Sequence, residues 1–128
     1  MWEVVKKNRP GKVSMNLKYS ELACKCGYSN CHFTLLYYPS IDAFNYTRND
    51  FGEPIIMTSA FRCQSHNTDV GGVDESYHTK GMAHDLMPVN REDDAFDRLH
   101  EIAQRYYDVV IPYHSKGFIH CHKLGVEK

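Results

Sequence analysis

The strongest pattern in this chain is the helical periodicity of residues 91–107. Acidic residues crowd the first turn of this segment, and Asn90 precedes it in a position suited to capping a helix. Apolar side chains recur along it at helical spacing: Phe96, Leu99, Ile102 or Ala103, and Tyr106. Because such a stripe marks the buried face of a helix, the segment predicts a helix packed on a hydrophobic core, and not a cofactor-binding box.

Short segments on both sides of this helix have the character of strands. Residues 54–59 combine β-branched and apolar side chains, which is typical of a short buried strand. Residues 82–88 alternate, so that Asp85 lies on one face of the expected strand and His84 on the other. Two more strands are expected around a turn at residues 112–117, namely 108–111 and 118–124.

A second helix and two irregular regions complete the prediction. Residues 40–51 have a partial apolar face, with Ser40 suited to begin the helix and Gly52 suited to end it. Residues 1–37 are expected to form an irregular arm, and residues 60–80 a polar loop. A mixture of helices with short strands that hairpins can join predicts an α+β fold, a small antiparallel sheet flanked by helices.

Length and charge limit the kind of protein this can be. The 128 residues suit a single domain, and 15 Lys and Arg against 16 Asp and Glu give a formal net charge of −1. Without a basic patch, neither nucleic acid nor a membrane is expected as a partner. No apolar stretch approaches the roughly 18 residues of a membrane span and the first residues are charged, so we expect cytoplasmic synthesis without a signal peptide.

The chain carries 8 His and 5 Cys, side chains that bind transition metals and, for histidine, move protons near neutral pH. His78 and Asp85 flank a glycine, while His120 and His122 would face the same side of a strand. Two imidazoles and a carboxylate suit a catalytic zinc site. The same ligand set could hold non-haem iron, and a metal-free His–Asp hydrogen bond would give the same pattern.

Three blocks of sequence have a recognisable spacing. Residues 76–85 fit S-x-H-x-x-G-x-A-x-D, residues 58–67 read T-S-A-F-R-C-Q-S-H-N, and residues 117–122 read G-F-I-H-C-H. These blocks resemble motifs of the zinc D-Ala-D-Ala carboxypeptidase and murein endopeptidase family, which is peptidase M15-like and also called LAS-type. The first block matches the family signature, the second resembles its T-S-G-Y-R-C-x-x-H-N segment, and the third resembles its G-F-V-H-x-D strand. Ala60 and Phe61 are mild departures from that pattern.

Residues 19–27 also resemble the F-S-x-x-E-F-x-C-K-C-G opening of short phage-associated members, so the resemblance covers about residues 17–124. It implies the zinc D-Ala-D-Ala carboxypeptidase (hedgehog/DD-peptidase-like) fold. It also implies a zinc-dependent peptidase that cleaves peptidoglycan stem peptides, as a D-Ala-D-Ala carboxypeptidase or a murein endopeptidase such as an endolysin. We expect a monomer that acts on the cell wall after release, in phage or prophage lysis. The alternative is a non-catalytic peptidoglycan- or peptide-binding module that retains the zinc site.

The resemblance implies His78 and Asp85 as zinc ligands and places a third ligand in the last strand. Alignment on Gly117 makes that ligand His120, whereas members with H-x-H would use His122. We take His120 as the metal ligand. His122 is then expected to face the same cleft and to take part in proton transfer.

The resemblance also assigns Arg62 to the anchoring of substrate and places Ser76 beside it, with a structural ion pair and turn capping as the respective alternatives. Many members carry an acidic general base three residues before the final ligand, but Gly117 stands there in this chain. The catalytic proton carrier is therefore expected to be His122 or His114. Loss of a general base typically costs about 10² to 10⁴ in rate.

Five cysteines leave at least one thiol outside any intramolecular disulfide scheme. Cys24, Cys26, Cys31 and His32 have the spacing of zinc ligands and permit a second, structural zinc ion. The family resemblance makes a disulfide between Cys63 and either Cys24 or Cys26 an alternative. Reduced thiols are a third, as expected for a cytoplasmic product.

Overall fold

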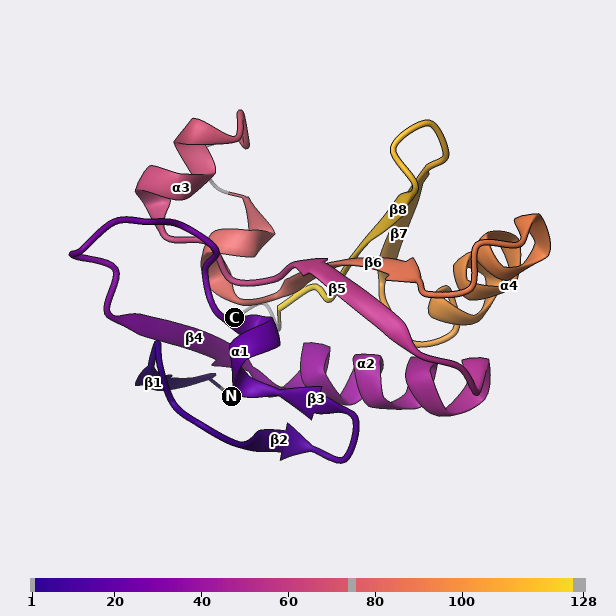
Figure 1. Ribbon diagram of the computed structural model, residues 1–128, viewed down its shortest axis with the longest axis horizontal. Coiled ribbons are helices and arrows are strands. Elements are labelled where there is room, and N and C mark those ends of the chain that lie inside the picture. The colour runs from indigo at the N-terminus through magenta and orange to yellow at the C-terminus, as the bar shows by residue number, and fades with distance from the viewer. Residues whose placement is uncertain (1, 74–75, 126–128) are drawn as a thin grey trace.

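The computed structural model describes residues 2–73 and 76–125. At its centre lies a four-stranded antiparallel sheet with the strand order β5-β6-β8-β7 (Figure 1). Its strands are β5 (Ile55–Ser59), β6 (Ala83–Pro88), β8 (Phe118–His122) and β7 (Val109–Tyr113). The predicted α+β class with a small antiparallel sheet is confirmed.

The register of β6 and β8 decides which side chains meet. Asp85 pairs with His120 across these strands, and Ala83 pairs with His122. Directly opposite residues of antiparallel strands point to the same face of the sheet. Asp85 and the two histidines of β8 therefore project from one face, and His84, next to Asp85 in β6, projects from the other.

Strand β7 is longer than predicted. The expected turn at Pro112 is wrong, because the strand runs on to Tyr113 and Pro112 pairs with Ile119 of β8. Since β7 is the edge strand of the sheet, the missing N–H of the proline faces no further strand and is tolerated there.

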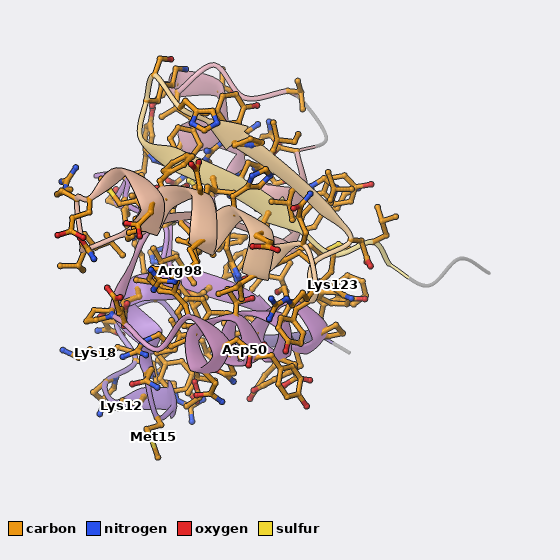
Figure 2. The ribbon with its side chains drawn as sticks, turned by 90° about the vertical axis from the view of Figure 1, so that its right-hand side faces the viewer. Lys12, Met15, Lys18, Asp50, Arg98 and Lys123 are labelled. Atoms are coloured by element: carbon orange, nitrogen blue, oxygen red, sulfur yellow. The ribbon has the colours of Figure 1, made fainter. Side chains whose placement is uncertain are left out.

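Two long helices lie on the face of the sheet that carries His84. They are α2 (Tyr38–Phe51) and α4 (Asp93–Ala103). Their apolar side chains form one buried cluster with those of the sheet, which includes Phe44, Leu86, Leu99, Ala103, Ile119 and Cys121. Figure 2 shows the two helices side by side, with Arg98 of α4 and Asp50 of α2 labelled. Within the described residues, neither these nor any other helix is long and apolar enough to cross a membrane.

Both helices begin at other residues than predicted. Ser40 lies inside α2, where its hydroxyl donates to the carbonyl of Tyr37 at 2.7 Å. Glu92 is the N-cap of α4. Asn90, two residues earlier, accepts a hydrogen bond from the backbone N–H of Glu92 at 2.9 Å through its side-chain oxygen. The predicted end of α2 is confirmed, since Gly52 adopts φ 74°.

The N-terminal arm, predicted to be irregular, is largely regular. Its elements are β1 (Trp2–Lys6), β2 (Lys12–Ser14), β3 (Leu17–Lys18), α1 (Tyr19–Leu22) and β4 (Phe33–Tyr37). Strand β1 pairs antiparallel with β4, from Trp2 opposite Tyr37 to Lys6 opposite Phe33. Such a pairing joins segments far apart in the chain, so no local pattern marks it. Val5, Leu17 and Leu36 bury their side chains in the main core.

The predicted loop 60–80 contains two short helices, α3 (Gln64–Asp69) and the 3₁₀ helix η1 (Tyr77–Lys80). Gly81 ends η1 with φ 74°. A Cβ at Gly81 would lie 2.3 Å from the carbonyl oxygen of Leu35 in β4. The glycine of the signature is therefore required by its backbone angle and by the close approach of the arm.

Candidate metal centre

Three side chains from separate segments converge on the face of the sheet opposite the helices. One ligand atom each from His78 of η1, Asp85 of β6 and His120 of β8 lies within 4.8 Å of the others. Asp85 Oδ1 is 3.2 Å from His78 Nε2 and 3.0 Å from His120 Nδ1. We call these residues the His-Asp-His group. Its third member is His120 and not His122.

The hydrogen bonds of His78 fix which of its nitrogens faces the group. Its Nδ1 lies 2.7 Å from the carbonyl oxygen of Ala60. A carbonyl can only accept a hydrogen bond, so Nδ1 carries the hydrogen and Nε2 of the neutral ring turns a lone pair toward Asp85. A lone pair and a carboxylate at 3.2 Å need a proton or a cation between them.

His120 is oriented from behind by His122, whose Nδ1 is 2.9 Å from His120 Nε2. The ring of His122 stacks on Tyr77, with 4.0 Å between centroids and 11° between planes. Burial and the neighbouring His120 lower the pKa of His122 to about 4, so this ring is neutral near pH 7 and able to accept. When His120 Nε2 donates to it, His120 Nδ1 turns a lone pair toward Asp85.

The donor set fits a zinc ion. Donors about 2.0 to 2.1 Å from one zinc ion lie roughly 3.3 Å apart in a tetrahedral arrangement, close to the observed 3.0 and 3.2 Å. Burial raises the pKa of Asp85, but in the metal-free group the protons that His120 and His78 share with it outweigh burial and hold that pKa well below its usual range. The carboxyl is therefore ionised, and a bound cation would take the place of these protons. Ala60 and His122 supply the outer hydrogen bonds that zinc-binding histidines usually make.

Arg62 borders the group, with Nη2 3.5 Å from Asp85 Oδ2. Its Nε donates to Ser59 at 3.1 Å and its Nη1 donates to the side-chain oxygen of Asn67 at 3.1 Å. Asn67 is fully buried and donates in turn to the carbonyl of Val73 at 2.7 Å. The guanidinium is thus held in place beside the group while 15% of the side chain stays exposed.

Ser76 performs the turn capping that was its alternative reading. Its Oγ accepts the backbone N–H of His78 at 3.1 Å, as the N-cap of η1. The residue is buried. Its contact with substrate stays a prediction, whereas its support of the backbone of His78 is a direct contact.

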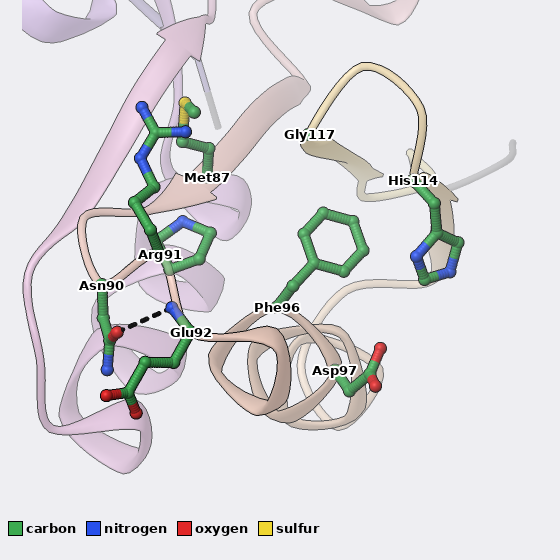
Figure 3. A pocket seen from close by; sticks show the side chains of 9 residues that line it. Met87, Asn90, Arg91, Glu92, Phe96, Asp97, His114 and Gly117 are labelled. Carbon is green, nitrogen blue, oxygen red and sulfur yellow. Dashed lines mark hydrogen bonds between the residues drawn. The ribbon is translucent and has the colours of Figure 1, made fainter.

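His114 lies away from the group. It follows Tyr113, at the tip of the β7–β8 hairpin, and its ring packs 4.8 Å from that of Phe96. Figure 3 shows both rings beside a cavity of about 400 Å³ that Arg91 also lines. His120 pairs with Ile111, three residues before His114, which corresponds to roughly 10 Å along a strand. The structure does not bring His114 to the site for which it was predicted.

Two residues to which the sequence assigned no role at the site lie next to the ligands. Tyr77 supports the ring of His122, and the carbonyl of Ala60 holds His78. Tyr77 directly precedes His78 in the signature, and its aromatic character was the one available signal. A backbone carbonyl gives no sequence signal at all.

A histidine and carboxylate group on one face of an antiparallel sheet, with an arginine beside it, has the make-up of a metal-dependent hydrolase centre. The sequence model of one family, described as Peptidase M15, matches residues 15–122. The chain belongs to the Peptidase M15 family, whose members are zinc-dependent peptidases. The predicted family resemblance and fold are thereby confirmed. A search among curated proteins found no significant match.

Proposed function

We propose that this protein is a zinc peptidase that cleaves the stem peptides of peptidoglycan, as a D-Ala-D-Ala carboxypeptidase or a murein endopeptidase. One observation carries the proposal: three donor atoms converge within 4.8 Å in a chain of the Peptidase M15 family. His78, Asp85 and His120 would hold the zinc. When bound, zinc supplies an activated water and a Lewis acid for the scissile carbonyl.

The surrounding residues would position the reactants. Ala60 and His122 orient the two histidines through the hydrogen bonds described above. Arg62 directs three of its five N–H groups to Ser59, Asn67 and Asp85. Its remaining N–H groups suit the carboxylate or a carbonyl of a peptide.

Proton transfer is where this chain departs from its relatives. In the arrangement that frees His120 Nδ1, His122 accepts at Nδ1 and carries its hydrogen on Nε2. We therefore infer that His122 is a positioning residue for His120, and not the general base. With Gly117 at the usual position of the acid, cleavage is expected to be slow.

The absence of an acidic residue at position 117 also favours a second candidate function, a module that binds peptidoglycan and retains zinc without cleaving.

The resemblance of residues 19–27 to short phage-associated members supports action on the cell wall after release, in phage or prophage lysis. We expect a monomer, without nucleic acid or membrane as partners.

Digestion of purified peptidoglycan tests these proposals. The zinc-loaded protein should release new free amines, together with free D-Ala if it is a carboxypeptidase. His78→Ala should abolish the release, and His66→Ala, on α3 outside the group, should retain it. Binding of stem peptides without cleavage would establish the second candidate. If the protein neither binds nor cleaves the stem peptides, both candidate functions are excluded.

A further inference from the structure

A second group of potential ligands lies outside the His-Asp-His group. Cys24, Cys26 and Cys31 come from the segment between α1 and β4, and Cys63 is the N-cap residue of α3. Their four sulfur atoms all lie within 4.8 Å of one another, and all four are free thiols. We call them the four-cysteine cluster. The predicted set is corrected at one position, because Cys63 takes the place of His32, whose side chain is exposed.

The sulfur spacing fits ligands that share an ion. Cys63 Sγ is 3.7 Å from Cys24 Sγ and 3.8 Å from Cys26 Sγ. Sulfur atoms about 2.3 Å from a zinc ion lie roughly 3.8 Å apart at the corners of a tetrahedron. Bonded sulfur atoms of a disulfide lie about 2.05 Å apart. These separations fit a shared metal ion, and the predicted disulfide from Cys63 to Cys24 or Cys26 is not present in this structure.

Hydrogen-bond donors surround the sulfur atoms. Lys7 Nζ is 3.3 Å from Cys26 Sγ, and the backbone N–H of Cys63 donates to Cys24 Sγ at 3.3 Å. Donors of this kind offset the negative charge that four thiolates bring to a divalent ion.

The cluster can also be reached from solvent. Cys31 lines a surface hollow of about 470 Å³ together with Lys7 and Ser20. Cys24, in contrast, is buried, with 4% of its surface exposed. A metal site needs such an entry path as well as a protected interior.

The cluster joins the N-terminal arm to the segment that serves the other group. Cys63 directly follows Arg62, and the backbone N–H of Arg62 donates to the carbonyl of His78 at 3.1 Å. One residue earlier, the N–H of Phe61 donates to the carbonyl of Leu22 in α1 at 3.1 Å. Residues 61–63 thus lie between the arm and the His-Asp-His group.

We propose that Cys24, Cys26, Cys31 and Cys63 bind a structural zinc ion that fastens the N-terminal arm to the segment carrying Arg62. Four thiolates fill a tetrahedral shell and leave no position for water, so this ion would stabilise the fold without taking part in hydrolysis. The proposal rests on residues other than those of the proposed peptidase site.

Metal analysis of the reduced, purified protein tests the ligand set. The wild type should contain two zinc ions per chain, Cys63→Ser one, and the matched variant His32→Ala two. His78→Ala should also contain one, but should keep the ion that Cys63→Ser loses. Retention of both ions in Cys63→Ser together with loss of one in His32→Ala would overturn the four-cysteine set. Iron in place of zinc would overturn the choice of metal.

Two measurements keep the proposal testable if Cys63→Ser fails to fold. Cobalt substitution of the wild type and of His78→Ala should give the intense near-ultraviolet band of thiolate-to-cobalt charge transfer, and its absence would contradict the proposal. Thiol titration of the wild type, unfolded in chelator without reductant, should find all five thiols, which are free in the structure. A count of three would show a disulfide instead.

Discussion

The His-Asp-His group and the four-cysteine cluster are built in opposite ways. Asp85 and His120 lie opposite each other on two paired strands, so the backbone ladder sets their positions. Three of the four cysteines lie in residues 23–32, a stretch without helix or strand. The sheet therefore positions two of the three residues of the first group before any metal binds, and η1 supplies His78. The second group has no such ladder and would depend more on a bound metal. In the His-Asp-His group the fold positions the metal, whereas in the four-cysteine cluster the metal would stabilise the fold.

The largest expected effects come from exchanging one ligand in each region. His78→Ala should abolish peptidase activity and cost less thermal stability than Cys63→Ser, because the strands that carry Asp85 and His120 remain paired. Cys63→Ser should lower the free energy of unfolding by about 3 kcal/mol or more, which is the stabilisation expected from zinc when its free concentration is at least about 100 times its Kd. Calorimetry should show a fall in Tm of roughly 10 °C. Equal losses of stability in both variants would break the comparison.

The next largest effect is expected from His122, which supports the His-Asp-His group. His122→Phe removes the acceptor for His120 Nε2 and should lower zinc affinity and kcat/KM by roughly 10- to 100-fold. His122→Asp, which restores the G-F-V-H-x-D pattern of the relatives, supplies another acceptor and should recover most of the loss. Zinc titration with a competing chelator measures the affinity. A Phe variant with unchanged zinc affinity would remove His122 from the group's support.

The close approach of β4 to η1 joins the arm, which carries three of the cysteines, to the helix that carries His78. Gly81→Ala forces a side chain into φ 74° and against the carbonyl of Leu35. It should cost about 1 to 3 kcal/mol in free energy of unfolding, which urea titration measures. Gly117→Ala, also at positive φ but with nothing within 4 Å of the added Cβ, is the matched control for the backbone strain alone. Equal losses would show that the approach of β4 contributes nothing.

The smallest expected effect concerns the end of strand β8. The backbone N–H of Leu124 donates to Asp108 at 2.7 Å, and this bond together with Lys123 lowers the pKa of Asp108. A carboxyl whose pKa is lowered by folding stabilises the protein fully above its unfolded value of about 3.9 and loses that stabilisation as the pH falls below it. The free energy of unfolding of Asp108→Asn should therefore lie below that of the wild type at pH 7 and approach it as the pH falls below about 3.9 and through the lowered pKa of the folded protein. A constant gap would assign the effect to packing.

The His-Asp-His group could largely be predicted from the sequence. The alternation of residues 82–88 placed Asp85 and His84 on opposite faces, and a spacing of two placed His120 and His122 on one side, as the strands confirm. Both inferences need only the period of a strand. The sequence did not show how far His114 lies from the group, because the distance from a turn to a site depends on the length of the hairpin. Strand β7 runs two residues further than predicted, through Pro112 to Tyr113.

The four-cysteine cluster could be foreseen only in part. Cys24, Cys26 and Cys31 are close in sequence, so their spacing indicates a site. Cys63 lies 32 residues beyond Cys31, and its approach depends on how α1 meets the end of β5. The adjacent His32 was the nearer candidate in the chain. The pairing of β1 with β4 could not be predicted for the same reason, because about 26 or more residues separate the two strands in the sequence and no hairpin joins them.

Strand β6 carries an ionised carboxylate and a neutral imidazole on successive residues. Asp85 faces the two histidines, while His84 is buried beside Phe44 and Tyr107, where burial lowers its pKa to about 3. Inserting or deleting a single residue within this strand would exchange the two, sending the charge into the core and the imidazole to the surface. As relatives of this chain diverge, changes of length are therefore expected in the loops around β6 and not within it.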